Sequence, residues 1–133
     1  MSKLTIFERI IQGEIPAAKI YEDEKFIAIL DVMPVVPGHT LVIPKKPAPY
    51  LFELDDKIYL ELMQLSKRIA NHLQKKLGCK RVCMTVIGWE VPHVHVHLIP
   101  TTDAAQLPLS GPERKKASSQ ELLELSEKLR FPR

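Results

Sequence analysis

The sequence of 133 residues lacks three features that would assign it to a specialised class of protein. It has no apolar run approaching the roughly 20 residues that cross a bilayer. Its first residues, Met1 to Leu4, do not begin the apolar segment of a signal peptide. It also has no dense basic stripe, because 19 basic residues stand against 16 acidic ones. These absences predict a cytoplasmic protein that interacts with neither membranes nor nucleic acid.

Cysteine is scarce as well, since the chain contains only Cys79 and Cys83. If the segment between them is extended, their Cα atoms lie farther apart than the ~7 Å that a disulfide spans. Neither cysteine has the neighbouring ligands of a zinc knuckle. We therefore expect two free thiols that act as packing residues in a reducing compartment.

The composition is that of one globular domain, with 45% hydrophobic and 26% charged residues. We assign residues 1–133 to a single domain, with a core over about 5–100 and a tail over 101–133. Within the tail, residues 107–112 are too rich in proline to form regular structure. Ser118 and Glu121 then have capping-box spacing, which predicts a short amphipathic helix to Leu129 that could cover the core.

Two helices are expected in the core of the domain. Thr5 and Glu8 form a capping box, which predicts a helix from Thr5 to about Gln12. A longer helix is predicted from Asp55 to Leu77, with Gly78 as its stop, because apolar residues recur there at helical spacing. These apolar residues are Ile58, Leu62, Leu65, Ile69 and Leu73.

Five segments have the character of strands, and they come in adjacent runs around the long helix. We place them at 19–21, 26–30, 39–43, 82–87 and 92–99. Strands in runs, rather than in strict alternation with helices, favour an antiparallel sheet with its helices on one side. The predicted fold class is therefore α+β, with an antiparallel sheet of about five strands, a long helix and short terminal helices.

The segment HVHVHLIP places His93, His95 and His97 at alternate positions. On a strand these side chains share one face, and Val94 and Val96 share the other. The apolar face suits the core, so we expect the histidine face to look into a cleft or into solvent. A polar outer face is one interpretation, but strict alternation of three histidines favours a specific role.

A metal site is a sharper alternative for this segment. The first and third histidines lie roughly 13 Å apart along an extended strand, so the three cannot all converge on one ion. Two could do so with other ligands, but no Asp completes an HxHxDH pattern. The interpretation we favour is catalytic and needs no metal. A neutral imidazole fixed by one hydrogen bond has a free lone pair, which can attack phosphorus while a neighbouring imidazole manages protons.

These residues resemble the histidine triad family, in particular its branch of nucleotide-binding hydrolases similar to Hint proteins. The segment 93–99 fits the pattern His-φ-His-φ-His-φ-φ, where φ is apolar, at every position. The stretches TIFERIIQGEIPAAKIYED and AILDVMPVVPGHTLVIPKK resemble the first helix and the central strands of the family. The match covers about Thr5 to Pro100, and His97 argues against the transferase branch, which has Gln at that position.

The resemblance implies a role for each histidine of the cluster. His95 would be the nucleophile at the α-phosphorus of a nucleotide, and His97 would contact the phosphate and assist the leaving group. His93 would support His95 through its backbone carbonyl and its ring. His39, on a neighbouring strand, would complete the cluster, although by itself it is an ordinary strand residue.

The resemblance also implies a nucleotide-binding surface. Asp31 would hold the ribose hydroxyls, although without the resemblance its position before Pro34 favours a turn-forming role. An apolar wall for a purine base would consist of Ile6, Phe7, Ile10, Ile29 and Val32, which could equally be core residues.

The turn before the triad departs from the family pattern. Thr85 stands near the usual Asn and Trp89 near the usual Gln of the phosphate-contacting turn, and Glu90 adds a carboxylate beside an anionic substrate. Thr5 and Glu8 replace a CxxC zinc pair of some bacterial relatives, so no structural zinc is predicted and no cofactor. A homodimer through the long helix and the sheet edge is implied by the resemblance.

The favoured function is hydrolysis of purine nucleoside phosphoramidates to AMP or GMP through a nucleotidyl-histidine. Three alternatives remain open at this point. They are a dinucleoside polyphosphate hydrolase, a nucleotide-binding module with little catalysis, and a metal hydrolase.

Overall fold

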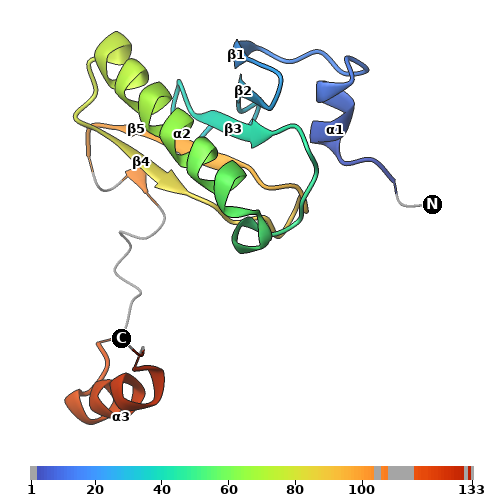
Figure 1. The fold of residues 1–133 in the computed structure, drawn as a ribbon. Helices are drawn as coiled ribbons and strands as arrows, with labels where there is room; N and C mark the ends of the chain where they lie inside the picture. The colour runs from blue at the N-terminus through green and yellow to red at the C-terminus, as the bar shows by residue number, and fades with distance from the viewer. Residues whose placement is uncertain (1–2, 104–105, 108–115, 131, 133) are drawn as a thin grey trace.

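The computed structural model describes residues 3–103, 106–107, 116–130 and 132 of the chain. One antiparallel sheet of five strands, in the order β1-β2-β3-β5-β4, forms the centre of the domain (Figure 1). The strands are β1 (Lys19–Glu22), β2 (Phe26–Leu30), β3 (Thr40–Pro44), β4 (Arg81–Thr85) and β5 (Val96–Thr101). The predicted α+β class is confirmed. Among the described residues, no helix has both the length and the hydropathy needed to span a bilayer.

The long helix α2 (Asp56–Leu77) lies across one face of the sheet (Figure 1). The Asp55 side chain caps it by accepting from the Ile58 N–H, and Gly78 ends it in the left-handed conformation with φ 65°. Its apolar face packs on strand residues such as Val42 and Val96 to form the larger core cluster. The predicted helix and its buried face are confirmed at Leu62, Leu65, Ile69 and Leu73.

The first helix, α1 (Ile6–Ile11), covers the opposite face of the sheet. Phe7 and Ile10 of α1 pack with Ile27 and Ile29 of β2, whereas the alternate residue Ala28 belongs to the cluster under α2. Because successive strand residues face opposite sides, the two helices sandwich the sheet. The expectation that the helices share one side is therefore wrong. The reason is that the strands are apolar on both faces and need a cover on each.

The last strand differs most from its prediction, since β5 runs over Val96–Thr101 instead of 92–99. Its pairing with β3 ends where Val42 faces Val96. The N–H of Val94 donates instead to the Ala48 carbonyl at 2.8 Å, so the chain has left the sheet there. At the other end the strand continues to Thr101, which faces Arg81 of β4.

The remaining boundaries differ by at most two residues from those expected, and one short element was not predicted. The third strand begins and ends one residue later than expected, and Pro44 is its last residue. Proline fits there because β5 pairs only with residues 40–42, so no bond from Pro44 to β5 is lost. The unpredicted element is the 3-10 helix η1 (Leu51–Glu53), which precedes α2.

The tail carries the predicted helix, α3 (Ser119–Leu129), capped by Ser118 (Figure 1). None of its residues is buried, so the expectation that it covers the core is wrong. Of the predicted irregular segment 107–112, residues 108–112 lie outside the described part of the chain. Cys79 and Cys83 are free thiols, as predicted.

Candidate active site

His93, His95 and His97 keep a common side, although only His97 lies in a strand. The alternate residues Val94 and Val96 belong to the core under α2. The rings of His95 and His97 are neighbours, with centroids 4.8 Å apart. The alternation read from the sequence therefore brings the three rings together.

The histidine side is more enclosed than expected. His93 has no exposed surface and His95 retains 7%, so the expectation of a cleft or solvent is wrong for His93. Phe7 of α1 contributes to this enclosure, because its ring lies edge-on to both, with centroids 5.9 Å from that of His93 and 4.7 Å from that of His95. The first helix therefore acts as the cover of the cluster.

One hydrogen bond fixes the tautomer of His95. Its Nδ1 lies 2.7 Å from the carbonyl oxygen of His93, and because a carbonyl can only accept, Nδ1 carries the proton. Burial lowers the pKa of His95, an effect that its bond to the His93 backbone opposes. The neutral ring therefore has its lone pair on Nε2.

The ring of His93 is held at both nitrogens. Nε2 lies 2.7 Å from the carbonyl oxygen of Pro44 and must donate to it. In the neutral ring Nδ1 is then an acceptor, and the hydroxyl of Thr5 lies 3.3 Å from it. His93 thus joins the end of β3 to the start of α1.

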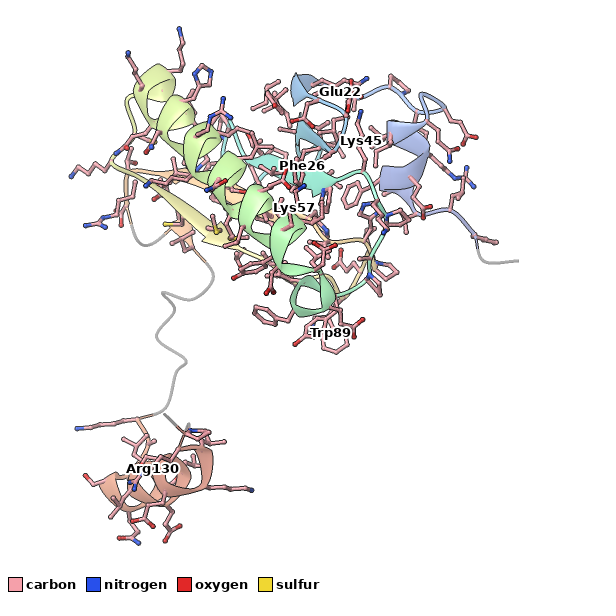
Figure 2. All side chains as sticks on the ribbon, viewed as in Figure 1. Glu22, Phe26, Lys45, Lys57, Trp89 and Arg130 are labelled. Atoms are coloured by element: carbon pink, nitrogen blue, oxygen red, sulfur yellow. The ribbon has the colours of Figure 1, made fainter. Side chains whose placement is uncertain are left out.

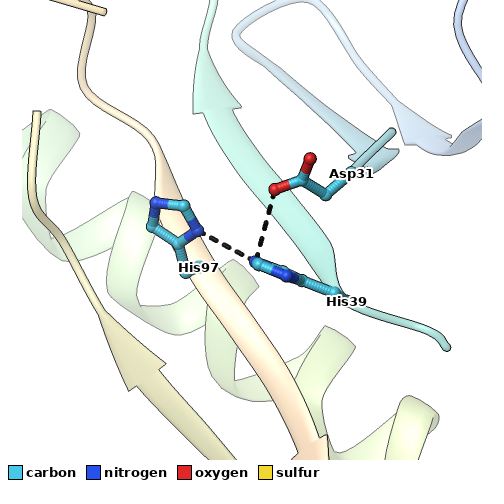
Figure 3. A group of neighbouring side chains, drawn as sticks. All are labelled: Asp31, His39 and His97. Carbon is cyan, nitrogen blue, oxygen red and sulfur yellow. Dashed lines mark hydrogen bonds and ion pairs between the residues drawn. The ribbon is translucent and has the colours of Figure 1, made fainter. Parts of the chain in front are cut away.

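His39 and His97 form a second linked pair, shown with Asp31 in Figure 3. The N–H of Val35 donates to Nδ1 of His39 at 3.0 Å. The proton of His39 is therefore on Nε2, which lies 2.9 Å from Nδ1 of His97 and 3.5 Å from Oδ2 of Asp31. Since His97 accepts at Nδ1, its own proton is on Nε2.

Both rings of this pair are neutral at neutral pH. Burial is the main cause that lowers the pKa of His39, and the nearby carboxylate of Asp31 opposes it. Burial, followed by the proximity of His95 and His39, lowers the pKa of His97 from 6.5 to about 4. His39, His95 and His97 are therefore uncharged imidazoles with assigned tautomers.

The comparisons with known proteins agree with this arrangement. A family model described as the HIT domain matches residues 12–104. The chain belongs to the histidine triad (HIT) family.

Relatives of this HIT protein have similar sequences and folds. An uncharacterized HIT-like protein of Borreliella burgdorferi is 37% identical over 102 residues, covering 71% of this chain and 73% of that protein. An adenosine 5'-monophosphoramidase of Saccharomyces cerevisiae is 38% identical over 101 residues, covering 74% of this chain and 63% of the yeast protein. The crystal structure of a HIT family member from Bacillus subtilis superposes with a TM-score of 0.80 at 29% identity, covering 98% of this chain and 99% of the other.

Asp31 lies at the edge of the cluster, where it has the turn role considered for it and also a contact with His39. Its Oδ1 accepts from the Met33 N–H at 2.8 Å, which forms a turn. Its Oδ2 faces His39, and 18% of the side chain is exposed. The carboxylate of Asp31 is therefore partly accessible to solvent at the edge of the cluster.

The residues expected to wall a base fall into two groups. Phe7, Ile10 and Ile29 are buried in the core cluster under α1. Ile6 and Val32 are 48% and 87% exposed and present free apolar surface.

The two residues expected beside the phosphate lie on and after β4. Thr85 faces His97 across the β4–β5 pair. Trp89 extends into solvent with 90% of its surface exposed, away from the core of the domain (Figure 2). The structure thus brings Thr85, but not the ring of Trp89, to the histidines.

Asp31, His39 and His97 are also the described residues whose arrangement comes closest to a metal site, with ligand atoms within 4.8 Å of one another (Figure 3). The hydrogen bonds do not fit an ion there. Because Val35 occupies the lone pair of Nδ1, His39 directs a proton and not a lone pair toward the centre of the group. A metal would have to displace that proton and break the bond to Val35.

Two hollows of about 490 and 320 Å³ lie elsewhere, both on the α2 side of the sheet. The first is lined by residues such as Tyr21 and Arg68, and the second by residues such as Tyr50, Met63 and Met84. The histidine cluster lies on the other side of the sheet, and none of its four histidines lines either hollow, although Thr85 borders the second.

Sequence reasoning missed three contacts that hold the cluster. They come from the Thr5 hydroxyl, the Val35 N–H and the Pro44 carbonyl. Two of these are backbone groups, which no side-chain pattern reveals. Thr5 was assigned only to its helix cap, and it is 88 residues from His93 in the chain.

Proposed function

We propose that the protein is a nucleotide hydrolase that cleaves purine nucleoside phosphoramidates at the α-phosphate, with His95 as the nucleophile. The observation that carries this proposal is the bond from His95 Nδ1 to the His93 carbonyl, which leaves a lone pair on Nε2 of a buried, neutral ring. The name of the yeast relative, an adenosine 5'-monophosphoramidase, supports the substrate class.

In the first step Nε2 of His95 bonds to the α-phosphorus and the bond from phosphorus to the leaving nitrogen breaks. The electron pair of that bond goes to the nitrogen, which must gain a proton to leave as an amine. His97 supplies it from Nε2, the nitrogen that does not face His39, once the bound substrate has given this ring a second proton on Nδ1, because the neutral ring would be left as an anion. A bound phosphate anion favours the charged form of His97, which opposes the effect of burial on its pKa.

In the second step water attacks the phosphorus and the bond to His95 breaks. Now neutral, His97 accepts a proton from the water, and His95 regains its lone pair. The products are a nucleoside monophosphate and an amine. His93 orients His95 through its carbonyl, and His39 directs a proton toward Nδ1 of His97.

The substrate would be held by groups around the open side of the cluster. Asp31 retains acceptor capacity for the ribose hydroxyls beside its bond to Met33. A purine base would lie on the exposed surface of Ile6 and Val32, in front of the buried residues Phe7, Ile10 and Ile29. Thr85 is the residue nearest to the phosphate on β4, whereas Trp89 needs a movement of its loop to reach it.

The decisive experiment is mass spectrometry of enzyme quenched rapidly during turnover of an adenosine phosphoramidate. We expect an adenylyl group on His95 and none in the His95→Ala variant, which should still bind AMP. Activity that persists in His95→Ala would refute the nucleophile. Faster release of AMP from a diadenosine polyphosphate would assign the protein to that substrate class instead. Rates that are unchanged in EDTA are expected, because no step uses a metal.

We also propose a homodimer formed through α2 and the edge strand β4. Strand β4 pairs on one side only, with β5. Apolar side chains are exposed around that edge, including Met84 at 46%, Leu60 at 57% and Phe52 at 69%. A second copy would cover them. Sedimentation should give twice the chain mass, and Met84→Lys should give the monomer.

A further inference from the structure

The side chain of Thr5 has two partners, one local and one distant. Its hydroxyl oxygen accepts from the N–H of Glu8 at 3.1 Å, and its own N–H donates to the Glu8 carboxylate at 3.0 Å. These two bonds form the capping box of α1. The hydroxyl proton is not used by the box, and His93 Nδ1 lies 3.3 Å from the oxygen.

The direction of that second bond follows from the other side of the ring. His93 must donate from Nε2 to the Pro44 carbonyl. A neutral ring then has only a lone pair at Nδ1, so Thr5 donates and His93 accepts. A ring with no exposed surface cannot turn to water for a replacement partner.

The position of His93 controls the next residue of the cluster. The carbonyl oxygen of His93 accepts from His95 Nδ1 at 2.7 Å and so sets both the tautomer and the orientation of that ring. The helix that begins at Thr5 also carries Phe7, which contacts both rings. A single short helix therefore holds the pair by a hydroxyl and by an aromatic ring.

We propose that Thr5 is a positioning residue for the reaction, whose hydroxyl holds the buried ring of His93 and, through the His93 backbone, aims Nε2 of His95 at the phosphorus. The inference rests on the proposed function for its effect on rate, but the Thr5–His93 contact is independent of it. Thr5 touches neither the substrate nor the reacting atoms. Its effect should therefore fall on kcat more than on KM.

The matched variants separate this role from helix capping. Thr5→Val keeps the shape of the side chain but removes the hydroxyl, and Thr5→Ser restores it. Glu8→Ala removes one half of the capping box and leaves the Thr5 hydroxyl in place. Glu8→Ala therefore serves as the control: it measures how much stability the cap contributes while the contact between Thr5 and His93 is kept.

The experiment combines side-chain nitrogen NMR of the ¹⁵N-labelled full chain with steady-state kinetics on an adenosine phosphoramidate. In Thr5→Val we expect the His93 Nδ1 resonance to shift and kcat to fall by about tenfold or more, the size found for groups that orient a reacting ligand. Thr5→Ser should restore both, and Glu8→Ala should change neither while lowering the melting temperature.

Two results would overturn the inference: an unchanged His93 resonance in Thr5→Val, or a loss of kcat in Glu8→Ala equal to that in Thr5→Val. If the wild-type protein does not hydrolyse the phosphoramidate, the proposed function fails. The NMR spectra of the same variants still test the Thr5–His93 contact in that case. Failure of the contact and failure of the proposed function are therefore distinguishable.

Discussion

The N–H of Val35 points at Nδ1 of His39 from 3.0 Å, and this contact decides the proton positions of two histidines. A charged His39 would carry a proton at Nδ1 and bring it against the Val35 N–H. The neutral ring with its proton on Nε2 avoids that conflict and donates to His97 at 2.9 Å. A backbone amide in the loop before β3 thus determines which nitrogen of His97 carries the proton.

Two substitutions at His39 separate its contact with the Val35 N–H from its contact with His97. His39→Gln places an amide donor near the former Nε2, whereas His39→Asn places its polar atoms near the former Nδ1 and leaves His97 without a donor. We expect His39→Gln to retain more activity, and His39→Asn to lose about tenfold or more in kcat. Steady-state kinetics with an adenosine phosphoramidate makes the comparison. Equal losses in the two variants would show that donation to His97 does not matter.

The lowered pKa of His97 predicts how stability depends on pH. In the folded chain this pKa is about 4, against an ordinary value of 6.5. Between these two pH values the unfolded chain binds more protons, so the free energy of unfolding falls as the pH falls. The lowered pKa values of His95 and His39 act in the same direction. Below about 4 the contribution of His97 is fully lost.

Urea unfolding of wild type and His97→Gln at several pH values between 7 and 4 tests this dependence. The variant should show a shallower fall in the free energy of unfolding, because it lacks one group that titrates differently in the two states. The difference between the two curves cancels the contribution of the carboxylates. Parallel curves would contradict the lowered pKa of His97.

Any side chain at Gly38, which precedes His39, should destabilise the fold. It has φ +93°, and a Cβ there would lie 2.6 Å from Cδ1 of Leu77 and 3.2 Å from Cγ of Pro100. We expect Gly38→Ala to destabilise the fold by about 1–3 kcal/mol through backbone strain and this overlap. The matched control is Gly13→Ala, because Gly13 has φ +83° but nothing within 4 Å of such a Cβ. The melting temperature of Gly38→Ala should be lower than that of Gly13→Ala. The reverse order would contradict the close approach of Leu77 to this position.

The exposed tail helix should contribute little to the stability of the domain. Because α3 buries none of its residues, a chain that ends at Leu107 should unfold within about 0.5 kcal/mol of the full chain at low protein concentration. This end point keeps Gln106, whose side chain accepts from the N–H of Thr102. Urea unfolding of the two chains makes the test, and a large loss would mean that α3 packs on the domain.

The helices were predictable almost to the residue because their signals are local. Thr5, Asp55 and Ser118 each cap the helix that follows, through a bond to an N–H three residues ahead. The start of β5 was not predictable, because it depends on where β3 stops pairing and on the distant carbonyl of Ala48. Strand ends are set by partners that the local sequence does not show.

The site was predictable to a similar extent. Alternate spacing was enough to bring His93, His95 and His97 to one side of the chain. It could not show that α1 crosses to that side and buries His93, because both sheet faces attract an apolar helix. The resemblance to the family supplied His39 and Asp31, and the bond between His39 and His97 agrees with that placement.

The short first helix also has a practical consequence for anyone who produces this protein. Its cap at Thr5 is only a few residues from the amino terminus, and the same hydroxyl touches His93. A purification handle fused just before Thr5 would lie next to the histidine cluster, and any change it causes there would not reflect the native site. The carboxyl end, beyond a helix that buries nothing, is the safer place for it.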